Sequence, residues 1–526
     1  MIDRVSFTSD NLDLKAVSGN GQSPCNSHDH YDVAVKRVPP GIFPAIPVDR
    51  RSARPLYRQL YDGYREAILD RRLRPGQRLP STRALATELR ISRLPVLQAF
   101  DQLLAEGYCE SRVGAGTFVS SSLPDQRPTP VARGAPAEPP GRPRRRTVSR
   151  RSSLVLRAGP DPWLAGRGAF RMSQAAVDLF PFRIWSGLVA RHGRDPRVAL
   201  LHYGSAMGHR PFREAVAAYL RTARAVRCEA DQIMVVSGSQ QALDLTARVL
   251  LDPGSRVWVE EPGYGGARDA LAMAGARLVP VPVDDEGLDV AAGIALCPRA
   301  RAAYVTPSHQ YPLGATLSAS RRLQLLDWAE RSGAFLIEDD YDSEYRYDSP
   351  PVAALQGLDR ASRVIYIGTF SKVLYPALRL GYLVIPEDLV DRFAAVRDAL
   401  DIFPPTFHQS VLTDFLTEGH FTRHVRRMRL LYRERREALV NALGKELGDT
   451  LTVRGGEAGM HLVATLAEGH RDRQISLRAA RKRLWAMPLS SCYLGEPTLQ
   501  GLVLGYGGTD VAGIRDGVRR LRAVIR

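Results

Sequence analysis

Apolar side chains between residues 55 and 120 recur at helical spacing and predict a small domain of three helices. The first helix ends before the Arg-Pro-Gly sequence at 74–76, the second begins with Ser81 as its N-cap, and the third with Ser92. Two short strands around Gly114 and Gly116 follow. The residues expected to face inward are Leu56, Leu60, Tyr64, Ala67 and Ile68 in the first helix, Leu85, Ala86 and Leu89 in the second, and Val96, Ala99, Phe100, Leu103 and Leu104 in the third. This order of elements is typical of a winged helix-turn-helix, whose third helix enters the major groove of DNA.

From about residue 168 the pattern changes to short apolar runs that alternate with helical stretches. This alternation predicts an α/β fold with a mainly parallel sheet, and its ligand site is expected at the carboxyl ends of the strands. The clearest predicted strands are residues 233–236, 257–259, 302–306, 335–337 and 364–367.

Segments without apolar periodicity divide the chain into four parts. Residues 1–53 are polar and are expected to be a disordered tail, and residues 54–120 form the helix-turn-helix domain. Residues 121–165 form a linker rich in proline and arginine, and residues 166–526 form the α/β domain. The basic run at residues 142–151 either adds non-specific phosphate contacts or is a solvated part of the linker.

Composition narrows the class of protein further. The chain has 526 residues and a formal net charge of +17, which suits an anionic partner such as nucleic acid or an anionic membrane surface, or serves solubility alone. No apolar run reaches the roughly 18 residues of a membrane span, and the N-terminus lacks the pattern of a secretion signal. We therefore expect a cytoplasmic protein with no membrane partner. The five cysteines are scattered, and neither a disulfide framework nor a metal site is expected.

The candidate chemistry centres on Lys372, which follows the strand at 364–367 on a turn rich in Gly, Ser and Thr. Partial burial lowers the pKa of such a lysine and frees its amine for a Schiff base with an aldehyde cofactor, for which pyridoxal phosphate is the candidate. The hydroxyls of Thr369 and Ser371 and the guanidinium of Arg379 suit its phosphate. Taken alone, a surface lysine after a strand is the simpler interpretation.

Residues at other strand ends support the cofactor interpretation. Residues 237–241 open a helix, and the free N–H groups of a helix N-terminus favour a phosphate. Tyr264 offers a ring for stacking on an aromatic cofactor, Asp339 a carboxylate for a pyridinium nitrogen, and Tyr341 a phenol for the cofactor's ring oxygen. Each has a simpler explanation as a cap or a core residue. Their order and their placement at strand ends favour a cofactor site.

The N-terminal domain carries motifs of a known family. The sequences Leu-Pro-Ser-Thr-Arg at 79–83, Ile-Ser-Arg at 91–93, Glu-Gly-Tyr at 106–108 and Gly-Ala-Gly-Thr-Phe-Val at 114–119 resemble the GntR-type DNA-binding domain. The resemblance implies contacts with DNA from Arg78, Ser81, Arg83, Ser92, Arg93, Gly114 and Gly116. A merely solvated basic face explains any single arginine, but it does not explain their placement on the reading helix and the wing.

This domain departs from the family pattern at two positions. Arg90 stands where the family has a turn glycine, and a left-handed backbone there costs about 1 kcal/mol relative to glycine. Leu94 and Pro95 replace a polar pair, which removes a hydroxyl suited to DNA. The operator sequence of other members is therefore not transferable to this chain.

The larger domain resembles the fold type I aminotransferases, and four of its sequences resemble the MocR family, which joins a GntR-type domain to an aminotransferase-like one. These sequences are Ser-Gly-Ser-Gln-Gln-Ala-Leu-Asp at 237–244, Glu-Glu-Pro-Gly-Tyr at 260–264, Thr-Pro-Ser-His-Gln-Tyr-Pro at 306–312 and Glu-Asp-Asp-Tyr-Asp-Ser-Glu at 338–344. The resemblance implies a large domain with a mainly parallel sheet and a smaller C-terminal α+β subdomain.

The same resemblance implies a role for each site residue. Lys372 holds pyridoxal phosphate, Asp339 pairs with its pyridine nitrogen, Tyr341 bonds its phenolic oxygen and Tyr264 stacks on its ring. The phosphate is held by Gly238, Ser239, Gln240, Ser371 and Arg379, and Tyr203 reaches the phosphate of a neighbouring subunit, which implies a homodimer. Aminotransferases place an asparagine before Pro-Thr-Gly, which is missing at 310–314, and His309 or Gln310 is expected to substitute for it.

Residues 501–506 contain no arginine, although aminotransferases that act on α-amino acids use one near the C-terminus to bind the carboxylate. Either the arginine comes from another segment or the effector is not an α-amino acid. His461 and residues 490–493 belong either to the effector pocket or to the core.

These features together predict a transcriptional regulator that binds operator DNA and senses an amino compound, or pyridoxal phosphate itself, through aldimine formation at Lys372. The alternative is a catalytically active aminotransferase of class I and II type fused to a DNA-binding module. A DNA-binding protein with an inactive second domain is disfavoured, because Lys372, Asp339 and Arg379 are all present.

Overall fold

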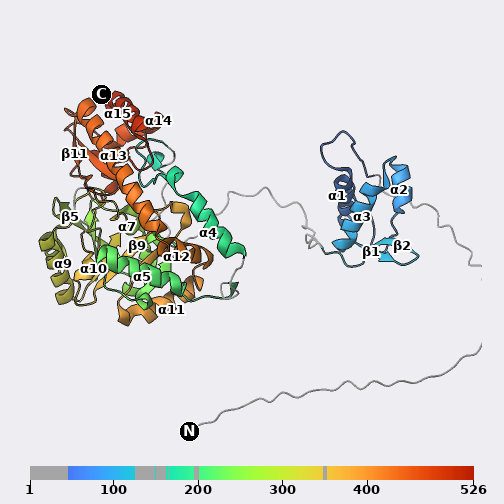
Figure 1. Ribbon diagram of the computed structural model, residues 1–526, viewed down its shortest axis with the longest axis horizontal. Helices are drawn as coiled ribbons and strands as arrows, with labels where there is room; N and C mark the ends of the chain where they lie inside the picture. Colours follow the sequence, from blue (N-terminus) through green and yellow to red (C-terminus); the bar gives the residue numbers. More distant parts are fainter. Residues whose placement is uncertain are drawn as a thin grey trace, which may run out of the picture. The chain divides into compact units, whose positions relative to one another are not determined.

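The computed structural model describes residues 46–124, 149, 161–164, 166, 168–194, 201–347 and 352–525. The chain divides into two compact units, Met1–Arg145 and Arg146–Arg526 (Figure 1). The expected tail up to residue 45 and most of the expected linker, including its basic run apart from Ser149, lie outside the described residues.

The N-terminal unit contains the three predicted helices and the predicted hairpin. The helices are α1 (Leu56–Leu69), α2 (Thr82–Glu88) and α3 (Arg93–Ala105), and the strands are β1 (Cys109–Arg112) and β2 (Gly116–Val119). The Ser81 hydroxyl accepts a hydrogen bond of 3.1 Å from the Ala84 N–H and caps α2 as predicted. Ser92 occupies the N-cap position of α3, but its side chain makes no capping hydrogen bond.

The core of this unit joins all three helices to the hairpin. The rings of Tyr64 and Phe100 meet edge to face with centroids 5.4 Å apart, and Leu60 and Leu103 are fully buried. Ile46 is also buried in this core, so the packed part of the domain extends at least eight residues before the expected start at residue 54. Leu56, Leu89 and Leu104 are half-buried rather than buried.

The turn between α2 and α3 and the wing both contain residues with a left-handed backbone. Arg90, between α2 and α3, has φ of 52°, so a residue with a Cβ stands where glycine is favoured. In the wing, Gly114 and Gly116 have φ of 74° and 108°. A side chain at Gly116 would also meet the guanidinium of Arg78, 3.1 Å from Nε.

The second unit is built on an eight-stranded sheet with the order β3-β10-β9-β8-β7-β4-β5-β6. Its strands are β3 (Ile233–Val236), β4 (Arg256–Glu261), β5 (Arg277–Asp284), β6 (Gly287–Leu288), β7 (Ala302–Val305), β8 (Phe335–Asp340), β9 (Val364–Thr369) and β10 (Gly381–Val384). Strands β5, β4, β7, β8 and β9 pair in parallel, whereas β10 runs antiparallel to both β9 and β3. The predicted mainly parallel sheet is confirmed.

Alternate side chains of the strands bury both faces of this sheet. Met234 and Val236 pack with α6 (Ser239–Leu250), α7 (Gly265–Met273) and α11 (Val390–Asp401). Ile233 and Val235 face the opposite side, where α5 (Arg210–Arg224) lies. Helices α8 (Val290–Leu296), α9 (Ala319–Ser332) and α10 (Leu355–Leu358) cover Trp258, Val305 and Val364. A sheet covered on both faces leaves its strand ends as the place for a ligand.

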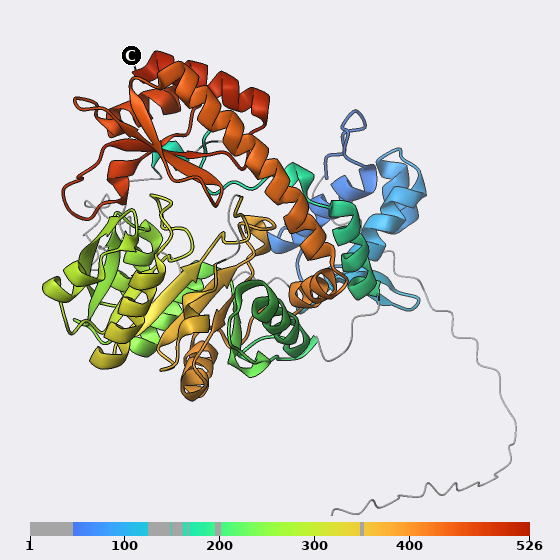
Figure 2. The ribbon, with the colours of Figure 1, turned by 60° about the vertical axis from the view of Figure 1, so that its left-hand side comes forward.

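The predicted C-terminal α+β subdomain is also present. Its antiparallel sheet has the order β11-β12-β14-β13, with β11 (Leu451–Arg454), β12 (His461–Leu466), β13 (Met487–Pro488) and β14 (Gly501–Gly505). Helix α13 (His420–Leu447), orange in Figure 2, packs against α15 (Val511–Ile525), and α14 (Asp472–Arg481) packs against β13. Helices α4 (Phe182–Arg194) and α12 (Phe407–Thr417) complete the unit. Among the described residues, no helix is long and apolar enough to cross a membrane.

Candidate functional site

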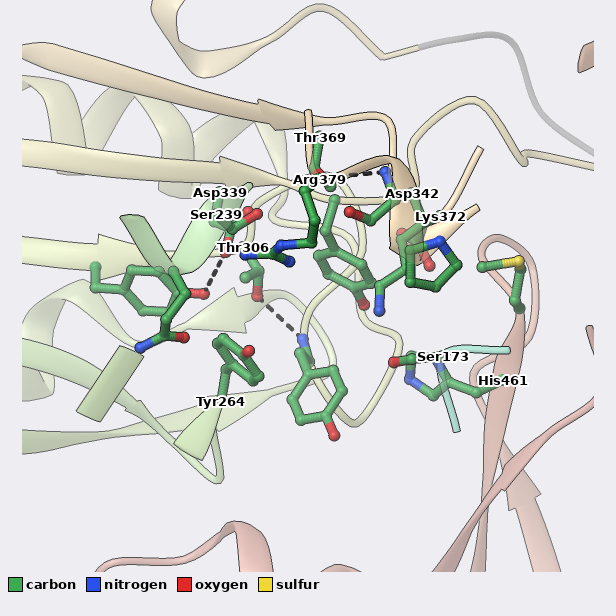
Figure 3. Close-up of a pocket in the computed structure, with 17 residues that line it drawn as sticks. Ser173, Ser239, Tyr264, Thr306, Asp339, Asp342, Thr369, Lys372, Arg379 and His461 are labelled. Atoms are coloured by element: carbon green, nitrogen blue, oxygen red, sulfur yellow. Dashed lines mark hydrogen bonds between the residues drawn. The ribbon is translucent and has the colours of Figure 1, made fainter. Parts of the chain in front are cut away.

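A cavity of about 220 Å³ lies at the carboxyl ends of the large sheet and is closed on one side by β12 (Figure 3). Its lining brings together most of the side chains predicted for the cofactor. They are Ser239, Gln240, Tyr264, Asp339, Tyr341, Thr369, Ser371, Lys372 and Arg379, and the remaining described lining residues are Ser173, Tyr304, Thr306, Tyr311, Asp342, Pro376, Met460 and His461.

Lys372 reaches this cavity from the turn that follows β9. The strand is buried along its whole length, from Val364 to Thr369, and it fixes the position of the turn. Burial of the ammonium lowers the pKa of Lys372 from 10.5 to about 8, although the carboxylates of Asp342 and Asp339 act in the opposite direction. About a tenth of Lys372 is therefore an uncharged, nucleophilic amine at pH 7, a far larger share than for an exposed lysine.

Asp339 is the buried carboxylate of the site and lies near the end of β8. Its Oδ2 accepts a hydrogen bond of 2.9 Å from the hydroxyl of Tyr304 on β7. Its Oδ1 is buried and has no partner among the described residues. Burial raises the pKa of Asp339 to about 7, against the effect of the Tyr304 hydrogen bond. An unpaired buried carboxylate oxygen is a costly arrangement that a cationic ligand would relieve.

The N-terminus of α6 and Arg379 form an anion-binding corner of the cavity. Gly238 caps α6 with φ of 107°, and a Cβ there would lie 3.4 Å from the guanidinium of Arg379. Arg379 itself has φ of 51°, a left-handed conformation that directs its side chain from the turn before β10. The first N–H groups of a helix, a guanidinium and the nearby hydroxyl-bearing residues Ser239 and Ser371 together suit a phosphate.

Two aromatic rings form another wall. Tyr264 and Tyr311 meet edge to face with centroids 5.5 Å apart, and both line the cavity. Tyr311 directly precedes Pro312, and it occupies the position where the resemblance to aminotransferases implies an asparagine. Its place before the proline was recognisable from the sequence, but His309 or Gln310 was predicted to replace the asparagine instead.

His309 and Gln310 lie behind the cavity and do not line it. Gln310 donates hydrogen bonds of 3.2 Å to Glu260 and 2.9 Å to the carbonyl of Pro262, so its amide braces the loop between β7 and α9. Thr306 donates a further bond of 2.6 Å to Glu260. Burial raises the pKa of Glu260 to about 7. This buried network holds the loop that carries Tyr311.

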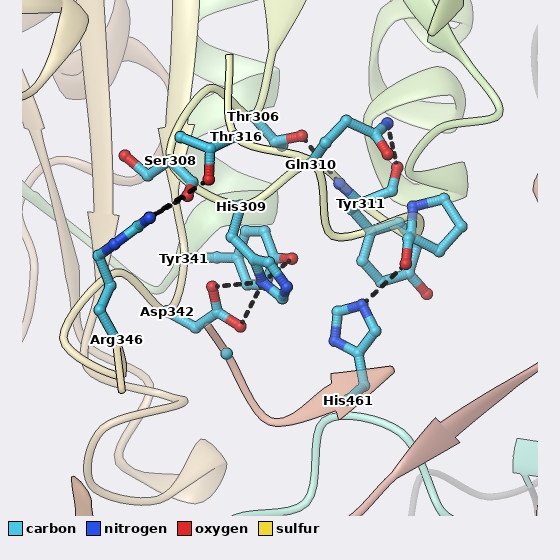
Figure 4. A network of polar contacts seen from close by, with 12 residues as sticks. Thr306, Ser308, His309, Gln310, Tyr311, Thr316, Tyr341, Asp342, Arg346 and His461 are labelled. Carbon is cyan, nitrogen blue, oxygen red and sulfur yellow. Dashed lines mark hydrogen bonds and ion pairs between the residues drawn. The ribbon is translucent and has the colours of Figure 1, made fainter. Parts of the chain in front are cut away.

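His309 instead connects two residues that do line the cavity (Figure 4). Its Nδ1 lies 3.1 Å from both carboxylate oxygens of Asp342 and 3.0 Å from the hydroxyl of Tyr341. A ring nitrogen holds at most one proton, so Nδ1 either donates to Asp342 or accepts from Tyr341. The proton of the Tyr341 hydroxyl is therefore coupled to the state of the His309 and Asp342 pair.

Tyr203 does not reach the cavity of its own chain. It is 82% exposed and contacts Phe403 edge to face, with centroids 5.8 Å apart. Its expected role in a neighbouring subunit stays a prediction.

In the N-terminal unit, the predicted DNA-binding residues gather around the start of α3 and the wing. Arg83, Ser92 and Arg93 are exposed, and Arg93 Nε donates a hydrogen bond of 3.1 Å to the Thr82 hydroxyl at the start of α2. Ser81 is exposed next to Thr82, and Arg78 lies beside Gly116 of the wing. Exposed cations at the N-terminal end of a reading helix are typical of contacts with DNA.

Comparisons with known proteins agree with this architecture. Residues 56–119 match the family described as bacterial regulatory proteins, gntR family, and residues 196–499 match aminotransferase class I and II. The chain is 41% identical to the probable rhizopine catabolism regulatory protein MocR of Rhizobium meliloti, over 90% of this chain and 95% of the relative. It is 33% identical to the pyridoxine biosynthesis transcriptional regulator PdxR of Corynebacterium glutamicum, over 86% of this chain and 92% of the relative.

Solved structures resemble the second unit. The α-aminoadipate aminotransferase LysN of Thermus thermophilus, solved with N-(5'-phosphopyridoxyl)-L-leucine, has a TM-score of 0.66 and 29% identity, over 72% of this chain and 97% of that one. The kynurenine aminotransferase of Pyrococcus horikoshii has a TM-score of 0.65 and 28% identity, over 72% and 96%. The chain therefore belongs to the MocR family of transcriptional regulators, in which a GntR-type DNA-binding domain precedes an aminotransferase-like domain.

Proposed function

We propose that this regulator binds operator DNA through its N-terminal unit and that an amino compound, or the cofactor itself, changes operator binding by acting at Lys372. The observation that carries the proposal is the convergence of Lys372, Asp339 and Arg379 on one cavity, in a chain that also carries an exposed reading helix.

Pyridoxal phosphate is the cofactor of this class of domain, and the side chains of the cavity fit it. The corner of Arg379, Gly238 and Ser239 suits the phosphate, and the unpaired Oδ1 of Asp339 suits a protonated pyridine nitrogen. Tyr264 suits the face of the ring and Tyr341 its phenolic oxygen. When bound, this cofactor supplies an aldehyde carbon that condenses with primary amines.

The residues of the chain prepare that chemistry in three ways. The lowered pKa of Lys372 supplies a neutral amine. Asp339 stays negatively charged once the protonated pyridine nitrogen of the cofactor pairs with it. Tyr341, together with His309, holds or moves a proton at the phenolic oxygen of the cofactor. A compound that competes for Lys372 frees its side chain, which alters contacts along the cavity wall. A tenfold change in operator occupancy needs about 1.4 kcal/mol of differential affinity.

For the DNA side, we propose that Arg83, Ser92 and Arg93 contact the major groove and its phosphates, while Arg78, Gly114 and Gly116 bring the wing to the backbone. The protein would act as a homodimer in the cytoplasm, with Tyr203 contributing to the site of its partner.

The test uses full-length protein and a DNA fragment selected by it from a random-sequence pool. Operator affinity is measured by fluorescence anisotropy at one fixed salt concentration, without cofactor, with pyridoxal phosphate, and with pyridoxal phosphate plus each protein amino acid. At least one condition is expected to shift the wild-type Kd by about tenfold. Lys372→Ala should abolish the shift, whereas Lys445→Ala, at an exposed lysine on α13, should retain it. Equal responses of wild type and Lys372→Ala would refute the proposal.

A second candidate function is transamination, because Lys372 and Asp339 are both in place in the cavity. Turnover of an amino donor and a keto acid at about 1 per second or faster, lost in Lys372→Ala, would support an enzyme. Cofactor-dependent operator binding without turnover would support the sensor alone.

A further inference from the structure

The turn between β3 and α6 carries the anion-binding corner and consists of two residues, Ser237 and Gly238. Gly238 stands at the N-cap position and has no side chain that could occupy the first N–H groups of the helix. The turn is fixed instead by Gln241, the third residue of α6, whose Oε1 accepts a hydrogen bond of 2.7 Å from the Ser237 N–H. A glutamine that reaches back over the first turn is one half of a capping box. It fixes the turn and leaves the helix N-terminus open to a ligand.

Gln241 is itself held by two charged residues near the end of α11. Nη1 of Arg397 donates hydrogen bonds of 3.2 Å to Gln241 Oε1 and to the carbonyl of Val235. Nε2 of Gln241 donates a bond of 3.1 Å to Oδ2 of Asp401, and Arg397 forms an ion pair with Asp401. Oε1 therefore accepts two N–H groups while Nε2 faces a carboxylate, which leaves the amide one orientation.

Arg397 is a buried cation whose position is informative. Its side chain is fully buried, and its Nη2 has no partner among the described residues. Burial lowers the pKa of this guanidinium, against the effect of Asp401. A buried ion pair contributes little to stability, because desolvation offsets the attraction between its charges. What Arg397 does provide is a bond to each side of the two-residue turn, to Val235 in β3 and to Gln241 in α6.

We propose that Gln241 and Arg397 are positioning residues that hold the turn at Ser237 and Gly238 in the shape that binds a phosphate. Neither side chain is among the described residues that line the cavity, so both act through the turn. The inference rests on the proposed function of the site and deepens it, because it assigns the preference for pyridoxal phosphate over unphosphorylated pyridoxal in part to side chains behind the cavity.

The fold separates this effect from the binding of the cofactor ring. The N–H groups of a helix N-terminus attract an anion along one direction, so a rotation of the turn weakens the phosphate contacts. Lys372 and Asp339 are carried by β9 and β8 and do not depend on this turn. Loss of Gln241 or Arg397 should therefore weaken the binding of phosphate and leave the binding of the ring unchanged.

The experiment measures the Kd of pyridoxal phosphate and of pyridoxal for full-length protein by equilibrium dialysis. The ratio of the two constants reports the preference for the phosphate. Gln241→Leu and Arg397→Met remove the polar contacts and should each reduce this preference about tenfold, through weaker binding of pyridoxal phosphate alone. Gln241→Leu changes no charge, so a loss that both variants share comes from the turn and not from electrostatic attraction. Gln324→Leu, at an exposed glutamine on α9, is the matched control and should leave both constants unchanged.

The outcomes distinguish this inference from the function on which it rests. A wild-type protein that takes up neither compound, or that binds both equally, would refute the proposed phosphate site itself. If the wild type prefers pyridoxal phosphate, three results would overturn the role of Gln241 and Arg397: unchanged ratios, equal losses for both compounds, or a loss confined to one of the two folded variants. Thermal midpoints show whether each variant is folded. If Arg397→Met does not fold, Gln241→Leu, at a half-buried position, decides the outcome alone.

Discussion

Tyr304 donates a hydrogen bond of 2.9 Å to one oxygen of Asp339, and the other oxygen of this buried carboxylate has no partner among the described residues. The two residues lie on neighbouring parallel strands, so the large sheet itself fixes the carboxylate. One oxygen is held in place and the other is left for a ligand.

Replacing Asp339 by Asn should stabilise the cofactor-free protein at pH 8. Burial raises the pKa of Asp339 to about 7 from 3.8, so the folded state binds the proton more strongly than the unfolded state. This residue's contribution to stability therefore falls as pH rises from about 4 to 7. Asn carries no charge, and the thermal midpoint at pH 8 should rise on the order of 2 °C, with little gain at pH 4. The same variant should bind pyridoxal phosphate less tightly. Asp398→Asn, at an exposed position on α11, should change neither quantity.

Covalent uptake of pyridoxal phosphate should depend on pH through Lys372. Its pKa is lowered by burial from 10.5 to about 8, so the neutral amine accumulates as pH rises toward 8 and is nearly complete about one unit above it. The rate measured by stopped-flow absorbance should therefore rise through pH 8 and level off near about pH 9. A rate that kept rising toward pH 10.5, as for an exposed lysine, would contradict the burial of this amine.

Arg90→Gly should stabilise the N-terminal unit by about 1 kcal/mol, because φ of 52° is strained for a residue with a Cβ. Hydrogen exchange of the α2 and α3 amides in the full-length protein would report the change. Arg90→Ala keeps the Cβ and serves as the control, since it removes the same charge without relieving the backbone. A gain in both variants would assign the effect to charge instead.

The double variant Arg83→Ala, Arg93→Ala should weaken operator binding at least about tenfold and reduce the salt dependence of the affinity. Arg93 is held at the start of α3 by its 3.1 Å bond to Thr82, so its loss removes a positioned cation. Anisotropy titrations at several salt concentrations would measure both effects. Arg183→Ala removes a charge from the second unit and should leave both unchanged; unchanged binding in the double variant would refute this DNA surface.

Local patterns predicted much of this architecture. The apolar run Ile233–Val236 is β3 with the predicted bounds, and Ser81 caps α2 as its sequence context indicates. Lys372, Asp339 and Tyr264 were predicted from their positions after strands, and the parallel sheet brings these ends together. Motifs next to strand ends can be recognised from the sequence as parts of one site, because the carboxyl ends of parallel strands meet at the same edge of the sheet.

Other features depend on contacts between residues far apart in the sequence, which a local sequence pattern cannot predict. Tyr304 reads as an ordinary core residue of a strand, and only its register opposite Ile337 of β8 brings its hydroxyl to Asp339. Phe170 stands about 330 residues before β14, and only its bridge to Gly505 in the folded chain reveals that the two segments are neighbours. Strand β10 is short and antiparallel within a parallel sheet, which the alternation of strands and helices does not predict.

The first turn of α3 exposes an apolar side chain next to a charged one. Leu94 is 62% exposed directly after Arg93, and Pro95 beyond it has no N–H to donate. These two apolar side chains can contact the C5-methyl group of thymine, and burial of one methyl group contributes about 0.8 kcal/mol to the free energy of binding. Replacing thymine by uracil in the operator should then weaken binding by about fourfold at the contacted base, and Leu94→Ala should remove the difference. Since 5-methylcytosine carries the same group, this reading helix has the chemistry to register methylation of its operator.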